Sequence, residues 1–113
     1  MPAFITDLPT LVPIVTSQGS PYPRFRRALT TGNLLLIRAA AAELPYVELG
    51  DALKIVAVMA AKQDHAYQRA AIRWLGRFAL ERAETLEQIR QAAQAFQALP
   101  RDQSALRSLE RLT

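Results

Sequence analysis

Residues 64–100 read DHAYQRAAIRWLGRFALERAETLEQIRQAAQAFQALP, which is the strongest folding signal in the chain. Apolar residues recur in it at steps of three and four, the spacing that places them on one face of an α-helix. The stretch predicts two amphipathic helices in succession. The core-facing stripe of the first holds Tyr67, Ala70, Ala71, Trp74, Leu75 and Phe78, and that of the second holds Leu86, Ile89, Ala93 and Phe96. We expect Trp74 at the centre of the core, with its indole N–H bonded to a carbonyl or a side chain.

Capping residues and a proline mark the ends of these two helices. Asp64 is a favourable N-cap for the first helix, which we expect to run from His65 to about Glu84. Residues 85–88, TLEQ, have the form of a capping box, in which the threonine hydroxyl and the glutamine side chain bond backbone amides of the first turn. The second helix is expected to stop before Pro100, because the residue that precedes a proline disfavours helical geometry.

Outward from this pair, the same signals predict four more helices. They are expected over about 22–31, 34–44 and 49–63, and in a short last segment. Gly32 is expected to end the first of these helices, Asn33 to cap the second and Asp102 to cap the last. The helix over 34–44 is apolar nearly all round, which predicts that it is buried. Short links between helices favour antiparallel neighbours. The expected fold is therefore all-α with about six helices, arranged either as a compact bundle or as a short stack of helical hairpins.

The N-terminal residues form a separate segment. Five of the seven prolines fall in residues 1–23, which divides the chain into an arm, residues 1–23, and a single helical domain, residues 24–113. The proline spacing excludes a helix in the arm and favours an extended path. The arm is also too apolar to be left comfortably in water, so we expect it to dock on the body of the chain or on a neighbouring copy. Its candidate partner-binding residues are Leu8, Leu11, Val12 and Ile14.

Composition excludes several kinds of chemistry. The chain has 113 residues, half of them apolar, and no cysteine, so it has no disulfide, thiolate nucleophile or cysteine-bound zinc. A single histidine removes the other usual zinc sites, and no glycine-rich loop or GxSxG turn is present. Asp64 and His65 are either a hydrogen-bonded proton-transfer pair or an exposed first turn. We expect no catalytic residue, no cofactor and no metal.

The sequence shows no sign of membrane insertion or export. The longest apolar run of the helical part, residues 55–61, lies between Lys54 and Lys62 and is far shorter than the about 20 residues that a membrane span needs. The first residues lack a basic segment and contain prolines where a signal peptide would be helical. We expect a cytoplasmic protein with no membrane partner.

Arginines supply the candidate functional surface, in a chain of net charge +4. Arg69, Arg73 and Arg77 follow one another at steps of four, which places them along one strip opposite the core stripe. Like charges at this spacing repel, so the strip is either a solvated face, or Glu81 pairs with Arg77, or an external anion or acidic partner binds. A second cluster lies where the arm meets the body and consists of Arg24, Arg26 and Arg27.

Gly76 is the remaining unusual residue of the predicted helix. A glycine inside a helix costs about 1 kcal/mol relative to alanine, so its presence favours a close approach. The approaching group is expected to be another helix or a ligand.

Three runs of the body resemble a known group of proteins. They are TGNLLLIRAAAAELPYVELGDAL, YQRAAIRWLGRFALE and TLEQIRQAAQAFQALP, which together with their surroundings cover about residues 24–100. The chain resembles small Ala/Leu/Arg-rich helical proteins of unknown function from high-GC actinobacteria. The resemblance implies a helical fold and carries no activity with it.

The sequence predicts a non-enzymatic protein–protein interaction module. It would act as an adaptor or as a homo-oligomer, with a protein partner or a second copy of itself bound through the arm and the arginine strip. The alternative is a small basic accessory protein that binds nucleic acid. Salt-dependent retention on DNA separates the two, because the neutralisation of phosphates makes binding fall steeply with salt.

Overall fold

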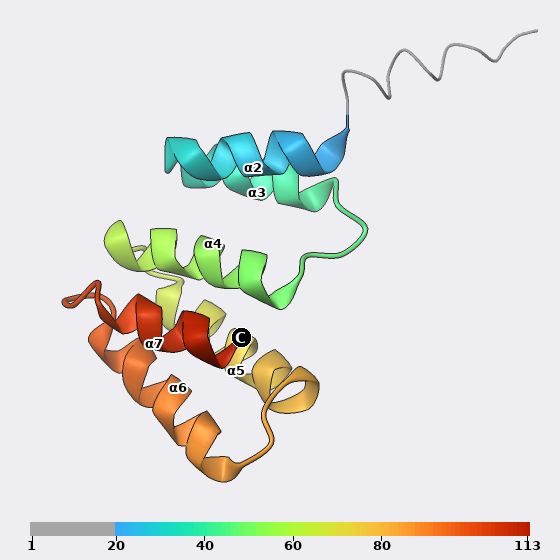
Figure 1. Ribbon diagram of the computed structural model, residues 1–113. Coiled ribbons are helices and arrows are strands. Elements are labelled where there is room, and N and C mark those ends of the chain that lie inside the picture. The colour runs from blue at the N-terminus through green and yellow to red at the C-terminus, as the bar shows by residue number, and fades with distance from the viewer. Residues whose placement is uncertain (1–19) are drawn as a thin grey trace, which may run out of the picture. The chain divides into compact units, whose positions relative to one another are not determined.

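The computed structural model describes residues 20–113. Leu8, Leu11, Val12 and Ile14, and with them the expected docking of the arm, lie outside the described residues. Within residues 20–113 every regular element is an α-helix, which confirms the all-α prediction (Figure 1). The helices are α2 (Pro21–Thr31), α3 (Leu34–Ala42), α4 (Leu49–Ala61), α5 (Tyr67–Glu81), α6 (Leu86–Ala98) and α7 (Ala105–Leu112). None of these helices is long and apolar enough to cross a membrane.

Packing divides the described residues into two units at the Pro45–Tyr46 junction. One unit contains α2 and α3, and the other contains α4 to α7. Residues 21–23 belong to the predicted arm but open α2, because prolines at the first helical positions cost no backbone hydrogen bond. Pro45, predicted only to separate two helices, coincides with the boundary between the units.

The first unit is a helical hairpin in which α2 and α3 lie side by side (Figure 1). Gly32 ends α2 in the left-handed conformation, at φ 66°, and its N–H donates to the Leu29 carbonyl. The Asn33 side chain caps α3 by accepting hydrogen bonds from the amides of Leu35 and Leu36, at 3.0 and 3.2 Å. Both predicted end signals are confirmed.

Helix α3 is not buried all round, so that prediction was wrong. Ile37 is fully buried, but Leu35 and Leu36 are 77% and 51% exposed. Within its unit α3 has a single helical neighbour, α2, and one neighbour covers one face only. An all-round apolar pattern favours burial but does not supply the second partner that burial requires.

The second unit is a closed arrangement of four helices. α4 packs against α5 and α7, and α6 packs against the same two helices. Each helix therefore has two neighbours, which within this unit is the arrangement of a bundle and not that of an open stack of hairpins.

Trp74 occupies the centre of the core of this unit, as predicted. Its side chain is 2% exposed, stacks on Phe78 with ring centroids 5.3 Å apart, and meets the edge of Phe96 at the same distance. The indole N–H donates to the Leu49 carbonyl at 2.9 Å, so the one polar atom of the side chain has a partner. These contacts join α4, α5 and α6 through one residue.

Tyr67 adds a second buried link between α5 and α6. Its hydroxyl donates to the Phe96 carbonyl at 2.7 Å. In a continuous helix that carbonyl would accept from the residue four positions later, which is Pro100 and has no N–H. Tyr67 therefore satisfies a carbonyl that the proline leaves without its helical donor. Burial raises the pKa of Tyr67 to about 12.

Helix ends agree with the sequence best where a capping box or a glycine marks them. Thr85 Oγ1 accepts from the Gln88 amide at 3.1 Å and Gln88 Oε1 accepts from the Thr85 amide at 3.2 Å, so the capping box is confirmed. α5 is shorter than predicted, since Asp64 accepts from the Ala66 amide and caps a turn that precedes the helix. Asp102 behaves in the same way towards Ser104, ahead of α7.

Candidate binding surface on helix α5

The arginine strip lies on the outward face of α5, away from buried Trp74 and Phe78. Arg69 and Arg73 are exposed, whereas Arg77 is only partly exposed. The structure thus brings the three predicted residues onto one helix, and their surroundings divide them into two groups.

Arg77 is held by groups of the chain itself. Its Nε donates to Glu81 Oε2 at 2.9 Å and its Nη2 donates to the Tyr46 hydroxyl at 2.6 Å. The guanidinium lies over the Tyr46 ring, 5.1 Å from the ring centroid, and the Tyr46 hydroxyl donates to Glu81 Oε1 at 3.2 Å. The hydrogen bond from Arg77 lowers the pKa of the Glu81 carboxyl, and the same bond raises the pKa of the guanidinium. Pairing with Glu81, one of the alternatives that would offset the repulsion between neighbouring arginines, is therefore observed for Arg77.

Arg69 and Arg73 differ from Arg77 in their surroundings. Among residues 20–113, neither guanidinium has a hydrogen-bond or ion-pair partner. Between them lies Ile72, an aliphatic side chain that is 65% exposed. Together with His65, Ala66 and Gln68, these three residues line one hollow of the surface.

An apolar groove runs along the other side of Ile72, between α5 and α6. Its volume is about 340 Å³, and Ile72 lines it as well as the hollow beside the arginines. The other lining residues are Tyr67, Gln68, Ala71, Leu75, Ala93, Phe96, Gln97 and Pro100. Sequence reasoning missed Ile72, although its position between two arginines and outside the core stripe was a visible signal.

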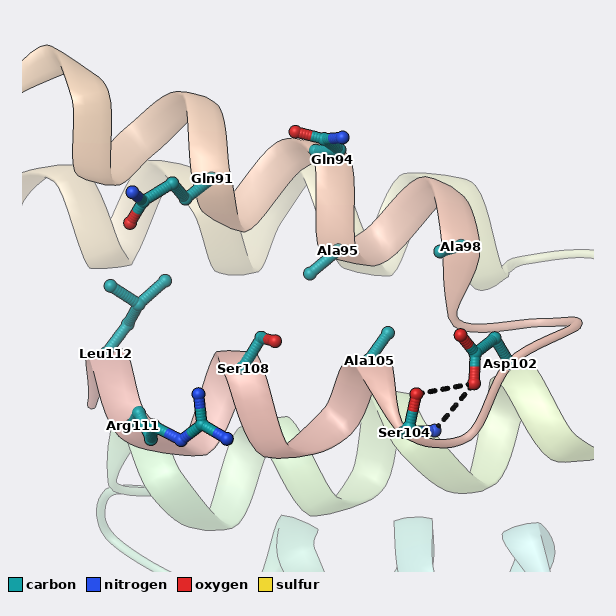
Figure 2. A pocket seen from close by; sticks show the side chains of 10 residues that line it. All are labelled: Gln91, Gln94, Ala95, Ala98, Asp102, Ser104, Ala105, Ser108, Arg111 and Leu112. Atoms are coloured by element: carbon teal, nitrogen blue, oxygen red, sulfur yellow. Dashed lines mark hydrogen bonds between the residues drawn. The ribbon is translucent and has the colours of Figure 1, made fainter.

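A larger and more polar groove lies between α6 and α7 (Figure 2). Its volume is about 530 Å³, with small residues Ala95, Ala98 and Ala105 facing the space between the two helices. Gln91 and Gln94 stand on the α6 side, and Ser108 and Arg111 on the α7 side. None of the candidate binding residues predicted from the sequence lines this groove. Alanines and glutamines on a helix surface carry no signal that separates a groove from an ordinary helix contact.

The second arginine cluster separates along α2. Arg24 forms an ion pair with Glu43 just after α3 and so links the two helices of the first unit. Arg26 donates to the Tyr22 hydroxyl at 3.3 Å, within its own helix. Arg27 is exposed. The three cations therefore do not share one set of contacts, and two of them bond groups within their own unit.

The structure also places the groups that raised catalytic or ligand hypotheses. His65 is exposed in the turn before α5, and the neighbouring Asp64 carboxylate bonds the Ala66 amide. Apart from the glycine's own helix backbone and chain neighbours, no heavy atom of residues 20–113 lies within 4 Å of the point where a Cβ on Gly76 would be. The expected close approach to Gly76 is therefore absent from the described residues. Residues 20–113 also contain no group of three or more histidine and carboxylate side chains placed to hold a metal ion.

Comparison with models of protein families, with curated proteins and with solved structures finds no match to this chain.

Proposed function

We propose that this protein is a non-enzymatic protein–protein interaction module whose partner binds the outward face of α5. The observation that carries the proposal is the group formed by Arg69, Ile72 and Arg73. Two cations without a partner among residues 20–113 flank an exposed aliphatic side chain, and that side chain borders an apolar groove. Arginines are enriched among the residues that contribute most of the binding free energy in protein–protein interfaces, which have an apolar centre.

The rest of α5 is suited to present such a surface. Trp74 and Tyr67, on the opposite side of the helix, are fixed by buried hydrogen bonds to α4 and α6. A helix whose backbone is held by its own core loses little backbone entropy when a partner binds, which favours affinity.

The experiment is a pull-down with the full chain from a lysate of its source organism, before and after nuclease treatment. The wild type is compared with the double charge reversal Arg69→Glu/Arg73→Glu. We expect a protein that is retained after nuclease treatment and lost from the double variant. Retention that disappears with nuclease would instead support the nucleic-acid alternative. In that case the protein should also be retained on DNA, and its retention should fall steeply as salt is raised.

Arg107→Glu/Arg111→Glu is the matched control. These two exposed arginines have the same spacing on α7, and Arg111 borders the α6–α7 groove. The control changes net charge by the same amount as the α5 variant. If it abolishes retention and the α5 variant does not, the binding surface lies on α7.

The arm and self-association are the second part of the proposal, and they rest on the sequence alone. Removal of residues 1–19 leaves α2 with its first residues intact. The solution mass of the two chains, relative to the 12.6 kDa protomer, shows whether the arm joins copies. A dimer that becomes a folded monomer without the arm supports arm exchange. An unchanged mass and an unchanged melting curve would remove the arm from self-association.

A further inference from the structure

We infer that the α5–α6 groove binds an acidic peptide segment that inserts one bulky apolar side chain beside Ile72. The inference rests on the proposed function and names the chemistry of its partner. It combines the position of Ile72 between two hollows, the size and lining of the apolar groove, and the distribution of charge around it.

The lining of the groove favours an apolar anchor. Ala71, Leu75, Ala93 and Phe96 form its apolar part, and its volume of about 340 Å³ accommodates a large side chain. Ile72 at its edge is 65% exposed, so a side chain placed there would remove apolar surface of both groups from water. Gln68 and Gln97 add side-chain amides, which can both donate to and accept from a peptide backbone.

The charge around the groove favours an acidic partner. Residues 66–80, which include all but the end of α5, contain three arginines and no carboxylate. α6 contains one arginine, Arg90, which forms an ion pair with Glu87 of the same helix, so α6 adds no unpaired carboxylate beside the groove. Arg77 is already neutralised by Glu81, so the cations left for a partner are Arg69 and Arg73, on the far side of Ile72 from the groove. A peptide matches this arrangement when its apolar side chain enters the groove and its carboxylates lie beside Arg69 and Arg73.

The same geometry favours a peptide over nucleic acid. Phosphates would neutralise Arg69 and Arg73 but would leave the apolar groove and Ile72 exposed to water. Residues 66–80 offer a single strip of cations, whereas phosphate-dominated binding draws on many contacts. A peptide covers both features at once.

The test is a selection from a displayed library of random 12-residue peptides against the immobilised full chain. We expect enriched peptides that combine an aromatic or large aliphatic residue with two or more carboxylates. Their affinity should fall when salt is raised, because exposed arginine–carboxylate attraction is screened. Enriched peptides without acidic residues would overturn the inference and leave the proposed interaction surface intact.

Two pairs of variants locate the binding. Ile72→Ser should weaken a selected peptide about tenfold or more, because a covered aliphatic side chain is lost. Leu80→Ser is its control, since Leu80 lies on the same helix, is 90% exposed and is not among the residues that line the groove. Arg73→Glu should weaken binding about fivefold or more, whereas Arg107→Glu should not. Circular dichroism confirms that each exposed substitution leaves the helices folded.

The outcomes separate the inference from the proposed function. Acidic peptides whose affinity is unchanged by both Ile72→Ser and Arg73→Glu would overturn the assignment of the groove as their binding site. Double-stranded DNA that competes with the selected peptides, and whose binding is weakened equally by Arg73→Glu, would overturn the choice of a peptide. A partner in the pull-down that depends on Arg69 and Arg73 but is not displaced by a selected peptide would keep the proposed function and reject the groove as its site.

Discussion

The inner and outer faces of α5 differ in what holds their side chains. On the inner face, Tyr67 and Trp74 each have a buried hydrogen bond to another helix, and Phe78 stacks on Trp74. On the outer face, Ile72 and Leu80 are exposed, and of the three arginines only Arg77 has a partner among residues 20–113. One helix therefore provides both buried core contacts of its unit and an exposed surface.

The difference shows that regular spacing does not make residues equivalent. Arg73 and Arg77 are one helical turn apart and share a face, yet a tyrosine 31 positions away from Arg77 fixes only that one.

Trp74→Ala should destabilise the second unit by about 3–5 kcal/mol, because it empties the centre of the core and removes contacts with Phe78 and Phe96. Thermal melting followed by circular dichroism measures the loss. Leu80→Ala, a large-to-small change on the outer face of the same helix, is the control and should shift the melt little. A Trp74→Ala melt within a few degrees of wild type would contradict the inner-face assignment.

Tyr67→Phe should cost about 1–3 kcal/mol at neutral pH, because the Phe96 carbonyl loses its donor and Pro100 cannot replace it. The cost should shrink at high pH. Burial raises the pKa of Tyr67 to about 12 in the folded chain, above an ordinary value of 10.0. The protonated form therefore stabilises the fold fully below about pH 10, and this contribution is lost as pH rises towards 12.

Denaturant unfolding of both chains between pH 9 and pH 11.5 measures this dependence. Between these two pH values, wild-type stability should fall by roughly 2 kcal/mol more than that of Tyr67→Phe. Parallel curves for the two chains would show that Tyr67 is not buried as described.

Gly76→Ala should stabilise the chain by about 0.5–1 kcal/mol, since alanine is the better helix former and nothing among residues 20–113 lies where its Cβ would be. A rise in melting temperature is the expected readout. A loss of stability would mean that another group packs against Gly76 in solution, as the sequence alone suggested.

Arg77→Gln should raise the pKa of the Glu81 carboxyl, because the hydrogen bond from Arg77 is the main cause of its lowered value. Arg73→Gln should leave that pKa unchanged. A carboxyl whose pKa is lowered in the folded chain stabilises the fold at pH values above its ordinary pKa. That stabilisation is lost as the pH falls through the lowered pKa. The part of the stability difference between wild type and Arg77→Gln that comes from Glu81 should therefore vanish in acid. Carboxyl titration by NMR checks both variants, and equal responses would contradict the division of the strip.

Arg69→Gln/Arg73→Gln should change stability by less than about 0.5 kcal/mol, because exposed charges without partners contribute little. The melt of this double variant completes the comparison. A clear loss of stability would show that these two arginines have contacts that the described residues do not provide.

The sequence was most informative about individual helices. Gly32, Asn33 and the Thr85–Gln88 capping box each predicted a helix end correctly, because these signals act within a single turn. Asp64 and Asp102 were less reliable, since an aspartate caps a short turn as readily as a helix. Of the candidate site, Arg69 and Arg73 were identified from their spacing, whereas Ile72 and the two grooves were not.

The sequence alone determined the all-α class, the order of the helices and the position of Trp74 in the core, because helical periodicity and caps depend on near neighbours along the chain. For residues 20–113, only the tertiary structure decided that Leu35 and Leu36 are exposed, that Arg77 has hydrogen-bond partners while Arg73 has none, and that no group lies where a Cβ on Gly76 would be. Each of these depends on which distant segment meets a given helix face. Tyr46 reaches Arg77 across 31 positions, and Tyr67 reaches Phe96 across 29. Contacts of that range follow from how helices pack together, and the period of a single helix does not record them.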